Sequence, residues 1–344
     1  MNVFELTRQL IDIPSTTGDE NGVGLFLASY LEDLGYDVET QDVRDERFNV
    51  IAKTSAPPRI VFSTHIDTVP PHIPSGEDDT RIFGRGACDA KGIVAAQIAA
   101  AEQLKREGVN EIGLLFTVDE ELSSLGARAA NDHVMAGECE FLVNGEPTDN
   151  KLALATKGSL RLKLTTKGRA AHSAYPEQGE SAIEKLLDLL TEVRAQEWPT
   201  DHLLGETTCN IGVINGGTRP NVIPAEASAE LQLRLVTVAA EIKKRFEELV
   251  ADRGAVEYLS ENDPVHLYNV DELDQCVVRF TTDIPYLTNW GQPLLLGPGS
   301  ILNAHTDHEF VLKSELEAAV DLYVRLARIL LSQARTVVAE GTSR

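Results

Sequence analysis

The sequence predicts an α/β protein in which a mainly parallel sheet, with helices on both faces, is interrupted by an inserted α+β module. Two observations predict this fold class. Short apolar runs alternate with stretches of helical periodicity towards both ends of the chain, which is typical of strands joined by crossover helices. Between these regions, apolar and polar residues alternate over several short segments, which is typical of half-buried strands. A length of 344 residues also favours two domains.

The outer parts of the chain contain the elements of the predicted parallel sheet. Residues 19–34 have helical apolar spacing with Asp19 as the cap, and the alanine-rich stretch 91–106 favours a helix. Short apolar runs predict strands at residues 49–53, 60–63, 112–118 and 141–143. Later in the chain, a strand at 293–296 and an amphipathic helix at 309–332 continue the same alternation.

The middle of the chain follows the order β-α-β-β-α-β, which is typical of a ferredoxin-like module. Its predicted elements are a strand at 159–166, a helix at 181–196, strands at 207–214 and 225–236, a helix at 238–252 and a strand at 255–259. We therefore expect one discontinuous domain from residues 1–156 and 268–344, with residues 157–267 inserted into it.

The overall composition excludes some classes of partner. A net charge of −23 and a pI near 4.7 argue against nucleic acid or an anionic membrane as partner, because both require a basic face. The acidity indicates a solvated surface. The alternative is a negative electrostatic field that favours cationic substrates or metal ions. The four cysteines form no Cys-x-x-Cys pair, and no secretory signal or membrane span is recognised. We therefore expect a cytoplasmic protein with reduced thiols.

Acidic residues and histidines follow four of the predicted parallel strands, or precede the helix at 91–106. These residues are His65, Asp67, Asp89, Glu120, Glu121, Glu146 and His305. Each has an ordinary alternative interpretation: His65 and Asp67 as a chance pair, Asp89 as a helix cap, Glu146 as a turn carboxylate, Glu120 and Glu121 as a charged loop, and His305 as a structural histidine. Because the carboxyl ends of parallel strands meet in one crevice, their joint occurrence predicts that they converge in space.

The charge of such a cluster predicts bound metal. Five carboxylates in one crevice oppose one another's ionisation unless cations compensate them. Two divalent ions supply nearly all of the compensating charge. Imidazole and carboxylate ligands suit zinc, with cobalt or manganese as alternatives.

Seven segments of the chain carry a family resemblance. They are STHIDTVP, GRGACDAKG, TVDEE, NGEPT, AAHSAYP, RPNVIPAEA and GPGSILNAHTDHEF. In this order they resemble the successive signatures of the M20 family of metallopeptidases and deacylases, and the match covers nearly the whole chain. The resemblance implies a three-layer α/β zinc-hydrolase domain with an inserted ferredoxin-like lid that also serves dimerisation.

The resemblance also implies a ligand set for two metal ions. Asp89 would bridge both ions. His65 and Glu146 would complete the first ion, and Glu121 and His305 would complete the second.

Three further positions near the ligands take roles from the resemblance. Glu120 would be the general base, and Asp67 would orient His65 by accepting its other ring N–H. The family usually has Pro-Asp where this chain has Asp307-His308, so His308 is an alternative ligand to His305.

The inserted module adds candidates for substrate binding. His172 matches a histidine that in relatives reaches a neighbouring subunit's active site and supports the oxyanion. Arg234, Arg219 and Asn221 resemble positions that contact substrate carboxylates or polar groups. The alternative is that these four residues are ordinary surface side chains.

The resemblance, together with the acidic composition, implies a two-metal hydrolase that cleaves the amide bond of N-acyl amino acids in the manner of an acetylornithine deacetylase, acting as a homodimer. A di- or tripeptidase or a carboxypeptidase of the same family is the alternative. A non-catalytic binding protein on the same fold is the alternative of another class. The sequence contains neither a Gly-x-Ser-x-Gly segment nor a nucleotide-binding glycine motif, which excludes the common serine hydrolases and nucleotide-binding enzymes.

Overall fold

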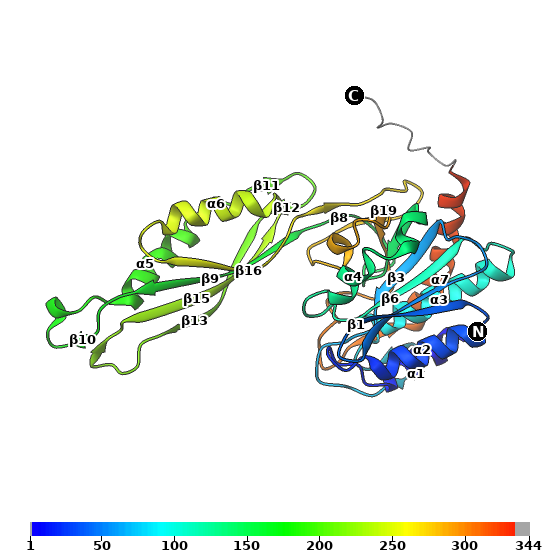
Figure 1. The fold of residues 1–344 in the computed structure, drawn as a ribbon, viewed down its shortest axis with the longest axis horizontal. Helices are drawn as coiled ribbons and strands as arrows, with labels where there is room; N and C mark the ends of the chain where they lie inside the picture. Colours follow the sequence, from blue (N-terminus) through cyan, green and yellow to red (C-terminus); the bar gives the residue numbers. More distant parts are fainter. Residues whose placement is uncertain (1, 334–344) are drawn as a thin grey trace, which may run out of the picture. The chain divides into compact units, whose positions relative to one another are not determined.

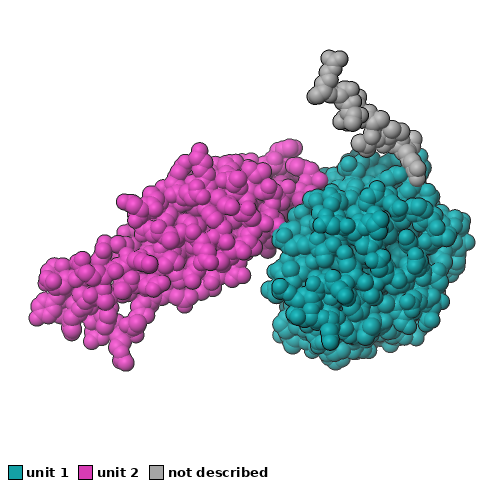
Figure 2. All heavy atoms as spheres, viewed as in Figure 1, with its two compact units in different colours: residues 1–154, 267–276, 282–344 teal, residues 155–266, 277–281 magenta. Residues whose placement is uncertain are grey.

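A computed structural model of the chain describes residues 2–333 (Figure 1). The described residues fold into two compact units, which Figure 2 shows in separate colours. Unit 1 consists of the residues up to 154, residues 267–276 and those from 282 onwards, and unit 2 consists of residues 155–266 and 277–281. Residues 277–281, which the sequence assigns to the outer domain, thus pack with unit 2. Within the described residues, no helix has the length and apolarity needed to cross a membrane.

Unit 1 contains a six-stranded sheet in the order β1-β2-β6-β3-β7-β19. Its strands are β1 (Asp37–Arg44), β2 (Arg47–Lys53), β3 (Ile60–His65), β6 (Ile112–Thr117), β7 (Phe141–Asn144) and β19 (Gln292–Leu295). Strand β3 pairs in parallel with β6 and β7, and β19 pairs in parallel with β7. Strands β1 and β2 form an antiparallel hairpin at one edge. The predicted mainly parallel sheet is therefore confirmed.

Residues that alternate along these strands enter two hydrophobic cores, because successive side chains of a strand point to opposite faces. Val50 and Phe62 belong to one core, and their neighbours Ile51 and Val61 belong to the other. The first core is covered by α1 (Val3–Asp12), α2 (Asn21–Asp33), α3 (Lys91–Arg106) and α7 (Lys313–Ser332), and the second by α4 (Leu125–Ala130) and the 3₁₀ helix Val134–Glu138. Burial of one large apolar side chain contributes about 1.5–3 kcal/mol, so strands covered on both faces are apolar throughout.

Helix α3 lies in the interior of unit 1 and fixes the loop before it. All residues from Lys91 to Ala101 are buried, and the helix packs against α1, α7, β3 and β6. Its alanines leave room for this close packing on every side. The loop that carries Asp89 runs directly into the first turn of this helix and is positioned by it.

Helix α7 begins at Lys313, so the predicted start at Glu309 was wrong. Residues Phe310–Leu312 instead form strand β20, which pairs with β5 (Arg81–Phe83) in a small sheet completed by β4 (Gly76–Glu77). The apolar periodicity of one segment does not reveal a strand partner that lies far away in the sequence. Helix α1 and strand β1 were not predicted.

Unit 2 contains a four-stranded antiparallel sheet in the order β13-β15-β9-β16. Its elements are β9 (Gly158–Lys167), α5 (Ala182–Arg194), β13 (Thr208–Gly216), β15 (Glu226–Leu235), α6 (Ala239–Val250) and β16 (Ala255–Asn262). Alternate leucines of the central strands, such as Leu162 and Leu231, pack with Leu186 of α5 and Phe246 of α6. The predicted ferredoxin-like order is confirmed.

Shorter elements connect these parts. Strands β8 (Leu152–Thr156), β17 (Val265–His266) and β18 (Gln275–Val278) form a sheet in the order β17-β8-β18. Two-stranded sheets are formed by β10 (Ala171–His172) with β14 (Val222–Ile223), and by β11 (Thr200–Asp201) with β12 (Gly205–Glu206). The remaining 3₁₀ helices are Pro176–Gln178 and Ile284–Tyr286.

Candidate metal centre

The structure brings three of the predicted ligands into one cluster at the carboxyl ends of the parallel strands. Ligand atoms of His65, Asp89 and Glu121 all lie within 4.8 Å of one another. His65 is the last residue of β3, and Glu121 follows the end of β6. The convergence follows from the parallel register of these two strands.

Asp89 lies between two histidines, and one of its oxygens faces each of them. Its Oδ1 lies 2.9 Å from Nε2 of His65, and its Oδ2 lies 3.4 Å from Nε2 of His305. Nε2 of His305 also lies 3.0 Å from Oε1 of Glu121. Among the described residues, no such contact joins the ring of His308 to the cluster. The arrangement of donors around Asp89 therefore involves His305.

The carboxylates of the cluster outnumber the groups that neutralise them. Glu146 is buried, and both its burial and the charge of Asp89 raise its pKa. Burial also raises the pKa of Glu120, as does the charge of Glu146, and burial raises the pKa of Glu121. Hydrogen bonds to Asp89 and Glu121 raise the pKa of His305 to about 10. A buried surplus of negative charge with imidazole and carboxylate donors fits a divalent cation.

Asp67 connects the loop after β3 to the loop after β6. Its carboxylate accepts hydrogen bonds from the backbone N–H of Glu120 at 3.1 Å and of Glu121 at 3.2 Å, and from the hydroxyl of Thr17 at 2.8 Å. Nδ1 of His65 lies 2.9 Å from the backbone oxygen of Asp67 and 3.5 Å from its Oδ1. Asp67 therefore holds the backbone of Glu120 and Glu121 as well as the ring of His65.

Comparison with known proteins identifies the family of the chain. Residues 61–329 match the model of peptidase family M20/M25/M40. The chain belongs to this family. It is 38% identical over 336 residues to an M20 domain-containing protein of Schizosaccharomyces pombe, with 94% of this chain and 84% of that protein covered. It is 37% identical over 364 residues to a probable carboxypeptidase of Aspergillus terreus, with 93% and 84% covered.

The fold is also similar to that of a solved structure. A tripeptidase of Staphylococcus aureus aligns with a TM-score of 0.81 at 19% identity, covering 96% of this chain and 98% of that one. Membership of the family makes the chain a metal-dependent hydrolase.

A buried ion pair, absent from the sequence analysis, supports the metal centre of this M20 hydrolase. Oε1 of Glu309 accepts hydrogen bonds from the backbone N–H groups of Cys88 and Asp89, both at 3.2 Å. Its Oε2 accepts one from Arg85 at 2.7 Å, and both side chains of this pair are buried. Glu309 lies four residues after His305, and it binds Arg85 and the backbone N–H of Asp89. These contacts therefore fix the loop that carries His305 against the loop that carries Asp89. Both residues lie in the quoted motifs, but no local pattern reveals a pair 224 residues apart.

Asp283 is a second residue near the cluster that the sequence analysis did not identify. It is buried, and its Oδ2 accepts a hydrogen bond of 2.7 Å from the hydroxyl of Thr117. Burial raises its pKa to about 6, and it contributes to the raised pKa of Glu120 and Glu146. Asp283 therefore adds to the negative charge of the centre.

Three of the predicted residues of unit 2 gather at the small β10–β14 sheet. His172 pairs with Val222, and the backbone oxygen of Asn221 accepts a hydrogen bond of 3.1 Å from Ser173. In the same turn, the backbone oxygen of Arg219 accepts a hydrogen bond from the backbone N–H of Val222. The side chains of His172, Arg219 and Asn221 are exposed.

Arg234 lies at the other end of strand β15 from this sheet. It lies eight positions after Glu226 at the start of the strand, a distance of roughly 26 Å. It pairs with Thr208 of β13 and Ser159 of β9 and lines a cavity of about 390 Å³. The structure therefore assigns Arg234 and Arg219, both predicted to bind substrate, to different surfaces of unit 2.

Proposed function

We propose that this M20 hydrolase uses two divalent cations, with zinc as the expected metal, to cleave the amide bond that joins an acyl group or peptide to a C-terminal amino acid. The observation that carries the proposal is the position of Asp89, whose two oxygens face two histidines, His65 at the end of β3 and His305 in the loop between β19 and β20. The names of the curated relatives, which include probable carboxypeptidases, support cleavage at a C-terminal residue.

The assignment of ligands to the two ions follows the two oxygens of Asp89, one facing His65 and the other facing His305. His65 and Glu146 would hold one ion, Glu121 and His305 would hold the other, and Asp89 would contact both. When bound, the two ions supply a Lewis acid for the substrate carbonyl and lower the pKa of water. Cobalt and manganese remain alternatives to zinc, because the donor atoms suit all three metals.

Glu120 is the proposed general base. It removes a proton from the attacking water and delivers it to the leaving nitrogen. Burial and the nearby Glu146 raise its pKa in the metal-free protein. The hydrogen bond from its backbone N–H to Asp67 fixes its position relative to His65.

Arg234 is the proposed partner of the substrate's α-carboxylate. A guanidinium on a strand binds a carboxylate through two parallel hydrogen bonds, and its strand neighbours limit its freedom. The alternation of β15 directs Arg234 away from the buried leucines Leu233 and Leu235. Arg219 and Asn221 are the alternative contacts.

The second candidate is N-acetylornithine deacetylation, which needs the same free carboxylate. The net charge of −23 favours a cationic side chain. The cavity at Arg234 opposes it, because Lys157 and Arg279 also line that cavity.

We further propose a homodimer in which His172 stabilises the oxyanion of the tetrahedral intermediate in the partner's active site. The support is strand β13, which is at the edge of its sheet and exposes Val213 and Ile214. An exposed edge strand with apolar side chains is a ready surface for pairing with a second copy.

The test is a substrate panel assayed with added zinc and with chelator. The panel contains N-acetylornithine, N-acetylmethionine, succinyl-diaminopimelate and several dipeptides, each as the free acid and as the carboxamide. We expect metal-dependent hydrolysis with a higher kcat/KM for the acids. Equal values for acid and amide would remove the carboxylate contact, and no hydrolysis of any amide by metal-loaded protein would overturn the function.

A further inference from the structure

The loop after β6, which carries Glu120 and Glu121, turns sharply at Asp119. This residue has a φ of 70°, in the left-handed region that a residue with a Cβ seldom adopts. Its backbone oxygen accepts a hydrogen bond of 2.7 Å from the N–H of Ser124, and its Oδ2 accepts one of 3.4 Å from the N–H of Leu125. A backbone conformation of this kind persists where the surrounding contacts hold it. The position of the two glutamates therefore depends on what holds Asp119.

Arg47 holds Asp119 from the neighbouring strand. Strands β2 and β6 are antiparallel, so the start of β2 lies beside the end of β6. Arg47 is the first residue of β2, and its Nη1 lies 2.8 Å from Oδ1 of Asp119 and 3.3 Å from Oε1 of Glu20. The side chains of Arg47 and Asp119 are only 8% and 2% exposed, so solvent screens this ion pair little. The guanidinium thus links the N-terminal part of the chain to the turn before the proposed base.

Asn49, two residues further along β2, holds the same segment at its two ends. Its Oδ1 accepts a hydrogen bond of 3.2 Å from the backbone N–H of Val118, and its Nδ2 donates one of 2.8 Å to the backbone oxygen of Gly126. Residues two apart on a strand point to the same face, so Arg47 and Asn49 both reach the segment. Asn49 therefore fixes the two ends of the segment, and Arg47 fixes the turn between them.

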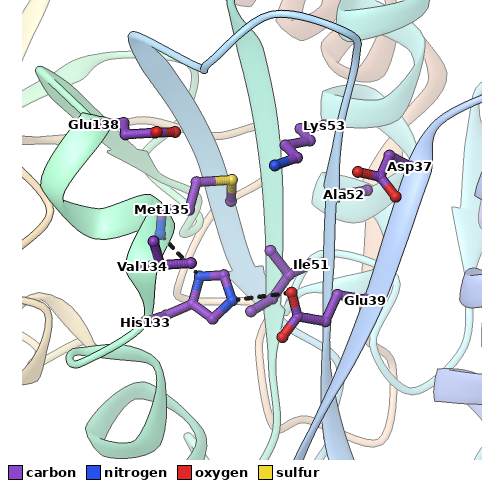
Figure 3. Close-up of a pocket in the computed structure, with 9 residues that line it drawn as sticks. All are labelled: Asp37, Glu39, Ile51, Ala52, Lys53, His133, Val134, Met135 and Glu138. Carbon is purple, nitrogen blue, oxygen red and sulfur yellow. Dashed lines mark hydrogen bonds and ion pairs between the residues drawn. The ribbon is translucent and has the colours of Figure 1, made fainter.

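The other end of β2 provides a contrast (Figure 3). Side chains of β2 line a cavity of about 100 Å³ there, in which the ring of His133 lies 3.3 Å from the carboxylate of Glu39. The Glu39 side chain is 62% exposed, and an ion pair in contact with solvent contributes little stability. The Arg47–Asp119 pair is buried, and the cost of removing both charges from water offsets much of their attraction. A gain in stability alone is thus a weak explanation for it, whereas its place directly before Glu120 relates it to the reaction.

We propose that Arg47 is a positioning residue for the hydrolysis. Through Asp119 it holds the turn before Glu120, while the hydrogen bond from the Glu120 backbone to Asp67 holds the residue after that turn. Without Arg47, the turn is free to adopt the commoner backbone conformations. A displacement of a reacting group by about 1 Å can lower the rate of an enzyme about a hundredfold. The inference rests on the proposed function, because it takes Glu120 as the general base.

The experiment measures kcat, KM and metal content for the zinc-loaded wild type, Arg47→Met, Arg47→Lys and Arg59→Met. The substrate is the N-acetyl amino acid or dipeptide of the panel above that the wild type hydrolyses fastest. Arg59→Met is the matched control, because Arg59 also forms an ion pair in unit 1, at 2.8 Å from Glu140, and its side chain is 12% exposed. Arg59 directly precedes β3, and His65 is the last residue of that strand, so the two are roughly 20 Å apart.

Arg47→Met should lower kcat by about ten- to a hundredfold and leave KM and metal content unchanged. Arg47→Lys should recover much of this loss, because a single nitrogen of Arg47 makes both contacts and an ammonium can take its place. Arg59→Met should lower the Tm without changing kcat. A normal kcat in Arg47→Met, an equal loss of kcat in Arg59→Met, or a loss of bound zinc in Arg47→Met would overturn the inference.

A second comparison tests whether Arg47 acts through Glu120. Residues that act as a unit have non-additive effects, so Arg47→Met should lower the residual activity of Glu120→Gln little further. An equal loss in the wild-type and Glu120→Gln backgrounds would overturn the inference. Failure of the proposed function gives a different result, in which Glu120→Gln itself retains a nearly normal kcat.

Hydrogen exchange decides the inference even where no substrate of the panel is hydrolysed. Backbone amides of residues 118–126 should exchange faster in Arg47→Met than in the wild type, whereas those of α3 should not, because only the turn loses a contact. Asp119→Asn keeps the shape of the side chain and weakens the ion pair, so it gives the same comparison where Arg47→Met does not fold. Unchanged exchange in residues 118–126, or faster exchange throughout unit 1, would overturn the inference.

Discussion

The two units contain charged clusters of opposite sign. In unit 1, Asp89, Glu120, Glu121 and Glu146 outnumber the histidines beside them, and burial raises the pKa of the three glutamates. In unit 2, three cations share a cavity with a single carboxylate. A ligand of the opposite charge would stabilise each cluster, a metal cation in unit 1 and an anionic group in unit 2.

Local charge and net charge point to different ligands for this protein. The net charge of −23 suggested a cationic substrate, but the cavity around Arg234 suggests an anionic one. Most carboxylates of the chain lie on the solvated surface, where water and salt screen them. Buried charges are screened much less.

Removal of metal is expected to have the largest effect, because it acts on the whole cluster of unit 1. Chelation should abolish hydrolysis, and zinc should restore it. Metal bound at 1,000 times its Kd stabilises the fold by about 4 kcal/mol, so chelation should also lower the Tm. A fully active protein without metal, as measured by elemental analysis, would contradict the assignment.

The loss of stability on chelation should grow with pH. Burial raises the pKa of Glu120 and Glu146 in the metal-free fold above their unfolded values. Such groups stabilise the fold below the unfolded pKa, and this contribution is lost as the pH rises through the folded pKa. The Tm of metal-free protein should therefore fall between acidic and neutral pH, and the difference from metal-loaded protein should widen. A constant difference would argue against the surplus of carboxylates.

The Glu120→Gln variant distinguishes the loss of the general base from the loss of a metal ligand in unit 1. The amide keeps the shape of the side chain but cannot take up the proton, so turnover should fall by about 10²–10⁴-fold or more. Metal content should stay near that of the wild type. A metal-loaded variant with nearly normal kcat would exclude Glu120 as the general base.

Arg234→Ala tests the cavity of unit 2, and Arg219→Ala is its comparison at the other end of β15. Arg234→Ala should lower kcat/KM for acid substrates by about ten- to a hundredfold and reduce the preference for the acid over the carboxamide. Arg219→Ala should leave that preference unchanged. The reverse result would move the carboxylate contact to the β10–β14 sheet.

Mixed dimers give the smallest signal, a partial recovery of activity. His172→Ala and Glu120→Gln chains are each expected to be weakly active alone. Heterodimers contain one site with both native residues if His172 acts on the partner's active site, so mixing should raise activity above the average of the two. No increase despite subunit exchange, shown by differently tagged chains, would exclude action between subunits.

Much of the fold could be predicted from local patterns. The alternation of Leu160, Leu162 and Leu164 gave strand β9 directly, because burial on one face leaves a periodic trace. The alanine-rich run gave helix α3 through the helix propensity of alanine. Helix α7 was misplaced at its start, since the pairing of Phe310 with Phe83 leaves no such trace.

The candidate site was predictable for a different reason. Parallel strands end at a common edge, so His65 and Glu121, at the ends of β3 and β6, had to lie close together once the strands were assigned. Asp67 was predicted to orient His65, but its hydrogen bonds to the backbone of Glu120 and Glu121 were not foreseen. Backbone donors are present at every residue, and the sequence does not indicate which of them a carboxylate will meet.

The sequence by itself determined the order of the elements, the two kinds of sheet and the residues at the strand ends, because all of these depend on the local spacing of side chains and on the direction of strands. The tertiary structure decided which distant charges meet. It paired Arg85 with Glu309 and gathered Lys157, Arg234 and Arg279 around one cavity. Such encounters depend on the path of the whole backbone, and a charged residue has the same letter in the sequence whether water or a buried partner surrounds it.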